Sequence, residues 1–198
     1  MHNPFTDEQN EKINTFISLA LEFNKTHNIF SREDSQEVFQ KDILDCHPII
    51  QYLEKDNTVL DLGSGGGFPG VLLSITKPNN KTYLIESSAK KCYFLRTVAD
   101  KLSLNNTTII NEKIKTKNTL GKFDIITARA FASIKNIMEL TQNNTKNKTK
   151  YVLLKGREQT IKQELTDINK NTHIYEIIKQ RLGPEERHVV LIKEKWIK

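Results

Sequence analysis

The chain has 198 residues and a net charge of +6, a length that suits one domain with a single hydrophobic core. No run approaches the roughly 20 apolar residues that span a bilayer, and the first residues lack the basic and apolar stretches of a secretory signal. We therefore expect a cytoplasmic protein without a membrane anchor. The excess of positive charge favours a polyanionic partner, although many lysine-rich surfaces are only solvated.

Two helices are predicted before the first strand. Thr6 and Gln9 have the spacing of a capping box, and apolar residues then recur at helical intervals to about Asn24. A second amphipathic helix is predicted over 34–53, kinked or divided at Pro48. This N-terminal extension, residues 1–55, has no strand of its own. We expect its helices to cover one face or edge of a sheet and to form one side of a pocket.

Strands and helices alternate from residue 56 onward, which is typical of a doubly wound, mostly parallel sheet. The last two strands follow one another without a helix and are expected to form an antiparallel hairpin through 181–184. Seven strands with such a pair predict an α/β, Rossmann-like core over 56–198 of the class I methyltransferase type, not the six-stranded dehydrogenase form. The predicted strands are 58–62, 81–86, 107–111, 123–128, 150–155, 172–179 and 187–194, and the helices are 68–76, 89–103, 133–142 and 157–169.

Two further features of the chain carry weaker signals. The polar, lysine-rich segment 141–150 predicts a solvated loop, although its lysines could contact RNA. Cys46 and Cys92 fall on predicted helices, far apart in sequence and without a Cys-x-x-Cys or a His pair at ligand spacing. We interpret both as buried thiols and expect no metal site.

A glycine-rich turn after the first predicted strand carries the strongest functional signal. In the register Asp-x-Gly-x-Gly-x-Gly, Asp61 ends the strand, and Gly63 and Gly65 follow. This register is typical of class I S-adenosylmethionine (SAM) methyltransferases, in which the acid helps to hold the cofactor's amino-acid end or an ordered water. The dinucleotide fingerprint Gly-x-Gly-x-x-Gly is also matched over 65–70, but it begins well after the strand and leaves Asp61 without a role.

A second acid, Glu86, ends the next apolar run. It lies at about the distance at which an acid accepts hydrogen bonds from ribose hydroxyls, a placement common to NAD and SAM enzymes. The alternative for Asp61 and Glu86 is helix capping or surface charge, and we disfavour it because both acids end apolar strands.

Several motifs are more specific than a generic cofactor loop. Gly-Phe-Pro-Gly at 67–70 and Arg-Ala-Phe-Ala at 129–132 are the clearest, and further matches lie at 23–29, 43–45, 90–96, 123–124, 154–156 and 186–190. With these motifs in order, nearly the whole chain resembles the glucose-inhibited division protein B family, also called ribosomal RNA small subunit methyltransferase G.

The resemblance implies SAM-dependent methylation of N7 of a guanine in 16S ribosomal RNA, in the loop beside the decoding centre, with the RNA or the 30S subunit as partner. We expect a monomer. Carried over by position, the cofactor site uses Gly63, Phe68, Glu86, Ser87, Ser88, Ile114, Lys115 and Arg129, in addition to Asp61 and Gly65. The chain departs from the family pattern at Lys115, where an acid is usual, at Glu86, where Asp is usual, and over 41–46, where Lys-Asp-Ile-Leu-Asp-Cys stands for Arg-His-x-x-Asp-Ser.

The residues themselves fit this chemistry. Guanine N7 carries a lone pair and no proton, so methyl transfer to it requires alignment in a water-poor site rather than a general base. The sequence offers no conspicuous base. It also lacks a Pro-Cys nucleophile for cytosine C5 and an Asn/Asp-Pro-Pro-Tyr/Phe motif for amino groups.

Three basic residues at the substrate edge of the predicted sheet are the candidate catalytic residues: Arg129, Lys155 and Arg187. Arg129 is interpreted as a clamp on the cofactor carboxylate or the substrate, or alternatively as an ion-pair partner of Asp61 or Glu86. Lys155 and Arg187, the latter beside His188, could contact guanine O6 or the RNA backbone, since a donor on N7 would block its lone pair. Phe68 and Phe131 could be core residues or stacking platforms.

Two alternatives to this function remain open at the level of sequence. One is a SAM methyltransferase acting on a small molecule or a protein, for which the basic charge would be incidental. The other is a non-catalytic RNA-binding assembly factor that keeps the fold.

Overall fold

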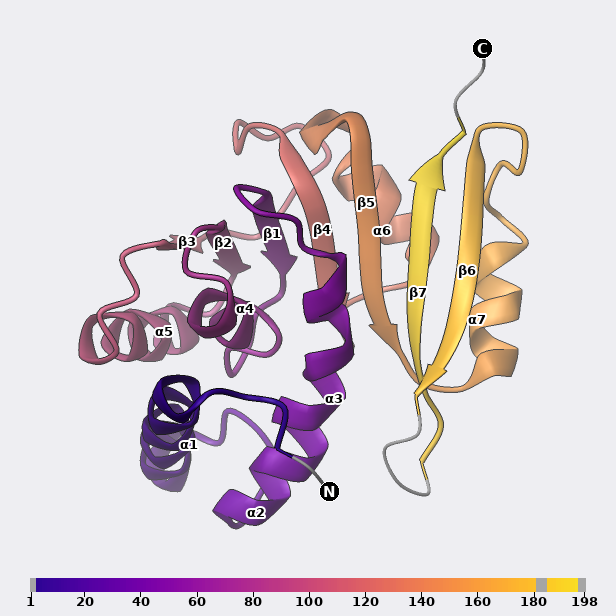
Figure 1. Cartoon of the computed structure of the whole chain (residues 1–198). Helices are drawn as coiled ribbons and strands as arrows, with labels where there is room; N and C mark the ends of the chain where they lie inside the picture. The colour runs from indigo at the N-terminus through magenta and orange to yellow at the C-terminus, as the bar shows by residue number, and fades with distance from the viewer. Residues whose placement is uncertain (1–2, 181–184, 196–198) are drawn as a thin grey trace.

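Seven strands form the central sheet of the computed structural model, which describes residues 3–180 and 185–195 (Figure 1). Their order across the sheet is β3-β2-β1-β4-β5-β7-β6. All pairings are parallel except those of β7, which runs antiparallel to β5 and β6. The strands are β1 (Thr58–Leu62), β2 (Lys81–Glu86), β3 (Thr107–Asn111), β4 (Phe123–Arg129), β5 (Thr145–Lys155), β6 (His173–Gln180) and β7 (Arg187–Glu194).

The predicted α/β class and mostly parallel sheet are therefore confirmed. The antiparallel pairing of the last two strands is also as predicted, whereas their connection at 181–184 lies outside the described residues. The helices and helical turns are α1 (Asp7–His27), α2 (Ser35–Val38), η1 (Phe39–Ile43), α3 (Leu44–Cys46), η2 (His47–Tyr52), α4 (Gly70–Thr76), α5 (Ala89–Lys101), α6 (Ile134–Leu140), η3 (Gln142–Asn144) and α7 (Glu158–Leu165). Among the described residues, no helix is both long enough and apolar enough to cross a membrane.

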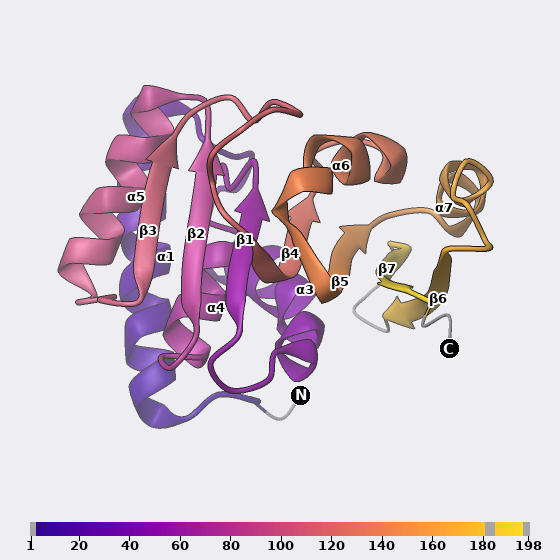
Figure 2. The same ribbon diagram turned by 90° about the horizontal axis from the view of Figure 1, so that it is seen from above.

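Helices cover both faces of the sheet (Figure 2). Successive residues of a strand point to opposite faces, so Val59 and Leu60 of β1 belong to two different apolar clusters. The cluster that contains Val59 joins the sheet to α1, α4 and α5, and the cluster that contains Leu60 joins it to α6 and α7. Burial on both faces explains why the central strands are continuous apolar runs rather than alternating ones.

The N-terminal extension packs on the first of these faces. The capping box is present: the Thr6 hydroxyl accepts from Gln9 N at 3.3 Å, and the Gln9 side chain accepts from Thr6 N at 3.1 Å. The predicted second helix is divided into α2, the π-helical turn η1, α3 and the 3₁₀ segment η2. Pro48 lies in the first turn of η2, where its missing N–H costs no helical hydrogen bond.

The expectation of a loop over 141–150 is wrong for most of the segment, because β5 begins at Thr145. Thr145 pairs with Phe123 across a register irregularity in β4. Side chains bond to the backbone at this irregularity: Thr149 Oγ1 donates to Phe123 O at 2.6 Å and accepts from Lys146 N at 2.7 Å. Polar residues that read as a loop thus support an irregular strand end.

Candidate active site

The strand order reverses between β1 and β4. From β1 the chain proceeds outward through β2 to β3, and from β4 it proceeds in the other direction. In open parallel sheets, ligands bind at the carboxyl ends of the strands on either side of such a reversal. Asp61 lies near the end of β1 and Arg129 ends β4, so both residues flank this crevice.

The glycine turn after β1 contains two kinds of glycine. A β-carbon on Gly65 would meet nothing nearer than Gly63 O at 3.6 Å, so Gly65 borders open space. A β-carbon on Gly70 would lie 2.6 Å from Asp61 Oδ2 and 2.8 Å from Leu84. Gly65 therefore leaves room beside the turn, while Gly70 allows α4 to pack closely against β1 and β2.

Asp61 is fully buried below this turn. Its Oδ2 accepts a hydrogen bond from Gly70 N at 3.1 Å, but Oδ1 has no partner among the described residues. Burial raises the pKa of the Asp61 carboxyl to about 7. The surface-charge alternative for Asp61 is thus wrong, whereas a contact with the start of α4 does exist. A buried oxygen without a donor fits a ligand ammonium or an ordered water.

Glu86 joins the end of β2 to the turn. Its Oε2 accepts from Gly65 N at 3.0 Å, and its Oε1 accepts from Ser88 N at 2.7 Å and Ser87 Oγ at 3.3 Å. Ser88 is the N-cap of α5. The hydrogen bond from Ser88 N to Glu86 therefore agrees with the helix-capping role that the sequence left open for Glu86, but it is only one of the contacts of this carboxylate. The carboxylate also lines a cavity of about 340 Å³, which we call the cofactor cavity.

The cofactor cavity brings together several of the predicted cofactor residues. Its lining includes Gly63, Glu86, Ser87 and Ile114, and the ring of Phe131, which a β-carbon on Gly63 would strike. Lys115 lines an adjoining cavity that shares Ile114.

Five predicted cofactor residues lie outside both of these linings. Asp61 and Gly65 belong to the turn described above, Arg129 lines a second cavity described below, and the other two are Ser88 and Phe68. Ser88 caps α5, its Oγ accepting from Lys91 N at 3.4 Å. Phe68 is buried, with its ring 5.0 Å from that of Phe16, so it anchors the turn in the core. A contact of either residue with the cofactor stays a prediction.

A second cavity of about 340 Å³ contains all three candidate catalytic residues. Its charged lining consists of Arg32, Lys41, Asp45, Arg129, Lys155 and Arg187, and we call it the basic cavity. Ala130 lines both this cavity and the cofactor cavity, so the two are neighbours. Sequence reasoning missed Arg32 and Lys41, although it placed their segment on one side of a pocket.

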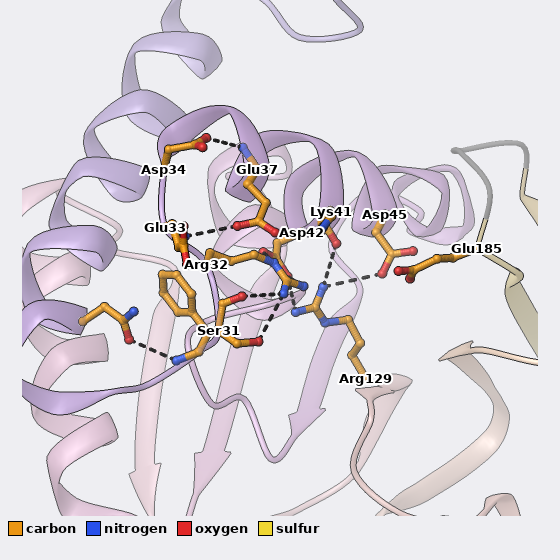
Figure 3. Close-up of polar contacts among 12 residues, drawn as sticks. Ser31, Arg32, Glu33, Asp34, Glu37, Lys41, Asp42, Asp45, Arg129 and Glu185 are labelled. Carbon is orange, nitrogen blue, oxygen red and sulfur yellow. Dashed lines mark hydrogen bonds and ion pairs between the residues drawn. The ribbon is translucent and has the colours of Figure 1, made fainter.

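Arg129 does not pair with Asp61 or Glu86, the alternative considered from sequence. Its Nη2 donates to Asp42 Oδ1 at 2.6 Å, and its Nη1 lies 3.5 Å from Asp45 Oδ2 (Figure 3). Its guanidinium carbon also lies 5.2 Å from the centre of the Phe68 ring, a cation–π distance. The N-terminal extension supplies both carboxylates, a long-range pairing that the sequence alone did not reveal.

The other basic residues of the cavity are also engaged. Lys155 Nζ lies 2.8 Å from Glu164 Oε2 and donates to Ala132 O at 2.7 Å. Arg187 pairs with Glu185 and lies 3.5 Å from Asp45 Oδ1. Burial raises the pKa of Asp45, against the opposing effect of Arg129 and Arg187.

His188 is buried beside the basic cavity rather than in its lining, with Nδ1 2.6 Å from Gly156 O. Cys46 and Cys92 are both buried free thiols, as predicted. Within the part of the chain that the structure describes, no cluster of three or more His, Cys, Asp or Glu side chains could hold a metal ion.

Comparison with known proteins decides the family. The family model of rRNA small subunit methyltransferase G matches residues 9–190. The chain belongs to this family. A ribosomal RNA small subunit methyltransferase G from Brachyspira hyodysenteriae is 33% identical over 188 residues, which cover 94% of this chain and 91% of that protein. One from Francisella tularensis is 32% identical over 96% of this chain and 90% of its own length.

Solved structures confirm the fold. The O-methyltransferase from Bacillus cereus in complex with SAH has a TM-score of 0.64 at 13% identity, covering 91% of both chains. A ribosomal protein L11 methylase from Lactobacillus delbrueckii has a TM-score of 0.64 at 15% identity, covering 79% of this chain and 80% of that one.

The family and the fold confirm SAM as the cofactor. The open space at Gly65 and the unpartnered Asp61 oxygen fit its binding.

Proposed function

We propose that this methyltransferase transfers the methyl group of SAM to N7 of a guanine in the decoding-region loop of 16S ribosomal RNA. It would act in the cytoplasm, on the free RNA, an assembly intermediate or the 30S subunit. The observation that carries the proposal is the adjacency of the two cavities at Ala130: one is lined by Gly63 and Glu86, the other by basic side chains. Relatives named as ribosomal RNA methyltransferases support it.

The cofactor side is built from the turn and the ends of β1 and β2. Asp61 and Glu86 would accept hydrogen bonds from the cofactor's amino-acid end and ribose, and Gly63 and Gly65 would let it approach the backbone. Phe68, Ser87, Ser88, Ile114 and Lys115 are the further residues that we assign to this side, whereas Arg129 lies in the neighbouring basic cavity. When bound, SAM supplies an electrophilic methyl group on its sulfonium.

The acceptor side needs to align a base rather than to remove a proton. Guanine N7 already carries the lone pair that attacks, so orientation and exclusion of water supply the rate enhancement. Lys155 and Arg187 line the basic cavity and would donate to guanine O6 or to phosphates, leaving N7 free. Asp45, the carboxylate of this lining, is held by Arg129 and Arg187, and the mechanism asks nothing of it as a base.

Mapping of N7-methylguanine in 16S ribosomal RNA tests the proposal. RNA is compared from cells with the gene, without it, and with a copy that encodes Gly65→Val. We expect one N7-methylguanine to disappear on deletion and to return only with the unaltered gene. An unchanged methylation map would contradict the proposal and would favour another substrate or a non-catalytic assembly factor.

A further inference from the structure

Asp42 occupies an unusual position among the acids of the chain. It lies in the π-helical turn η1, and its side chain is only 1% exposed. Its Oδ2 accepts from Arg32 Nε at 2.9 Å, and its Oδ1 accepts from Arg32 Nη2 at 3.3 Å and from Arg129 Nη2 at 2.6 Å. The two guanidinium groups thus converge on one buried carboxylate (Figure 3).

This arrangement solves an electrostatic problem. Two guanidinium groups so close together repel each other, and a carboxylate between them offsets that repulsion. A buried carboxylate is itself tolerated only when it is paired and hydrogen-bonded. Asp42 therefore holds together the segment before α2, which carries Arg32, and the end of β4, which carries Arg129. The carbonyl of Lys41, in the same turn, accepts from Arg129 at 3.4 Å and fixes it further.

Both arginines keep unused donors. Arg32 gives its Nε and one Nη2 hydrogen to Asp42 and its Nη1 group to Ser31. Arg129 gives one Nη2 hydrogen to Asp42 and its Nη1 group to Lys41 and Asp45. One Nη2 hydrogen of Arg32, and the Nε hydrogen and one Nη2 hydrogen of Arg129, have no acceptor among the described residues. Both side chains line the basic cavity and are about one-fifth exposed.

We propose that Asp42 is a positioning residue that holds Arg32 and Arg129 side by side so that together they bind one phosphate group of the acceptor RNA. This inference rests on the proposed RNA substrate. Guanidinium groups match the geometry of phosphate oxygens, and two of them held in register lose little conformational entropy on binding.

The cofactor's own carboxylate is the competing ligand for this arginine pair. The amino-acid end of SAM also carries an ammonium and lies next to a sulfonium, so the group as a whole is not anionic. Five cationic side chains and one carboxylate line the basic cavity. That lining suits a polyanion better than a group of mixed charge.

Binding measurements on three purified variants test the inference. Asp42→Asn removes the charge that holds the arginines, and Arg32→Gln removes one arginine while leaving Asp42 paired with Arg129. Asp124→Asn is the matched control: Asp124 also forms an ion pair, with Lys146 at 2.8 Å, but it lies at the opposite end of β4. The ligands are S-adenosylhomocysteine and 16S ribosomal RNA from a strain without the gene.

We expect Asp42→Asn and Arg32→Gln to weaken RNA binding about tenfold, while the Kd for S-adenosylhomocysteine stays within about twofold, and Asp124→Asn to change neither. Arg32→Gln should lower the slope of log Kd against log salt by about 1, the value for one lost phosphate contact. In an Arg32→Gln background, adding Asp42→Asn should cost less than it does alone, because part of its effect acts through Arg32.

RNA binding by Arg32→Gln that equals that of a methylating wild-type protein would overturn the inference and leave the proposed function intact. Weakened cofactor binding with unchanged RNA binding would also overturn it, by assigning the pair to the cofactor carboxylate. If the wild-type protein neither binds nor methylates the RNA, the proposed function and the inference both fall. Because Arg32 is partly exposed and its loss leaves Asp42 paired, Arg32→Gln gives a result even if Asp42→Asn does not fold.

Discussion

The carboxylate of Glu86 accepts a hydrogen bond from the backbone N–H of Gly65 at 3.0 Å. The end of β2 thereby fixes the shape of the turn that follows β1. The same carboxylate borders the cofactor cavity, so it both shapes the turn and lines the space that we assign to the cofactor.

Glu86→Ala should therefore lose cofactor affinity for two reasons. The variant loses the proposed acceptor for ribose hydroxyls and also the contact with Gly65 N. Hydrogen bonds to a charged group contribute roughly 1.5–3 kcal/mol each, so we expect the Kd for S-adenosylhomocysteine to rise at least about 30-fold by calorimetry. Glu8→Ala, on the exposed first turn of α1, is the control. Affinity within twofold of wild type would contradict the role of Glu86.

Substitutions at Gly65 and Gly70 should have different effects: the first should mainly reduce cofactor affinity and the second mainly reduce stability. Gly65→Val places its side chain in the open space beside the turn and should abolish binding of SAM; NAD should not bind even to the wild-type protein. Residue 65 has a positive φ of 55°, which also strains the valine variant. Gly121→Val shares a positive φ and has no neighbours within 4 Å, so it controls for strain alone. Calorimetry and thermal melting together distinguish the effects: normal SAM affinity in Gly65→Val would refute the assignment of the turn.

Gly70→Ala should show the opposite pattern. Its β-carbon would approach Asp61 Oδ2 and Leu84 to less than 3 Å, so we expect a loss of stability of about 1–3 kcal/mol from overpacking. Denaturant unfolding measures this loss. A stability equal to that of the wild type would show that α4 has room to shift.

Asp61 predicts how stability depends on pH. Burial raises the pKa of its carboxyl to about 7 in the folded protein, while the unfolded chain releases this proton near pH 4. Between about pH 4 and pH 7 the folded state binds more protons than the unfolded state, so this group makes the free energy of unfolding fall as pH rises. Above pH 7 the loss of unfolding free energy that ionisation of Asp61 causes is complete, and it is on the order of 4 kcal/mol.

Asp61→Asn removes this titration. Relative to the wild type, the variant should gain stability as pH rises from about 4 to 8, as measured by urea unfolding at several pH values. A difference between variant and wild type that is constant with pH would show that the Asp61 carboxyl ionises at its ordinary pKa.

The proposed chemistry predicts a methyl-transfer rate that does not depend on pH near neutrality. At saturating RNA and SAM, the single-turnover rate should stay nearly flat from about pH 6 to about pH 8, because N7 has no proton to lose. His188 lies buried beside the basic cavity, so His188→Asn should keep the methyl-transfer step even if it loses stability. A tenfold rise per pH unit that disappears in this variant would instead identify His188 as a base.

Lys155 and Arg187 should differ in what their loss costs. Alanine at either position should reduce methylation and leave SAM affinity nearly intact. Lys155→Ala should also lower stability, because it leaves the partly buried Glu164 without its ion-pair partner. Arg187 is more exposed, so its removal should act mainly on RNA binding, measured as a function of salt. A collapse of SAM affinity in either variant would place the residue on the cofactor side.

The local features of this fold could be predicted from the sequence. Apolar runs that end in Asp61 and Glu86 predicted two strand ends of one sheet edge, and the glycine spacing predicted the turn between β1 and α4. The pairing of Arg129 with Asp42 could not be predicted in this way, since it joins residues 87 positions apart through an irregular turn. Polar residues such as Thr149 misled the prediction because their partners are backbone groups of another strand.

The reversed direction of β7 has a consequence for how the site is divided along the chain. Because β7 is antiparallel to β5, His188 at the start of β7 pairs with Lys155 at the end of β5. The first residues of β7 therefore border the same crevice as the last residues of the parallel strands. The cofactor cavity comes from the middle of the chain, between Gly63 and Leu140. The basic cavity also draws on Arg32 and Arg187. If the two cavities have the roles that we propose, changes near either terminus can alter which acceptor the enzyme binds while the cofactor cavity keeps its lining.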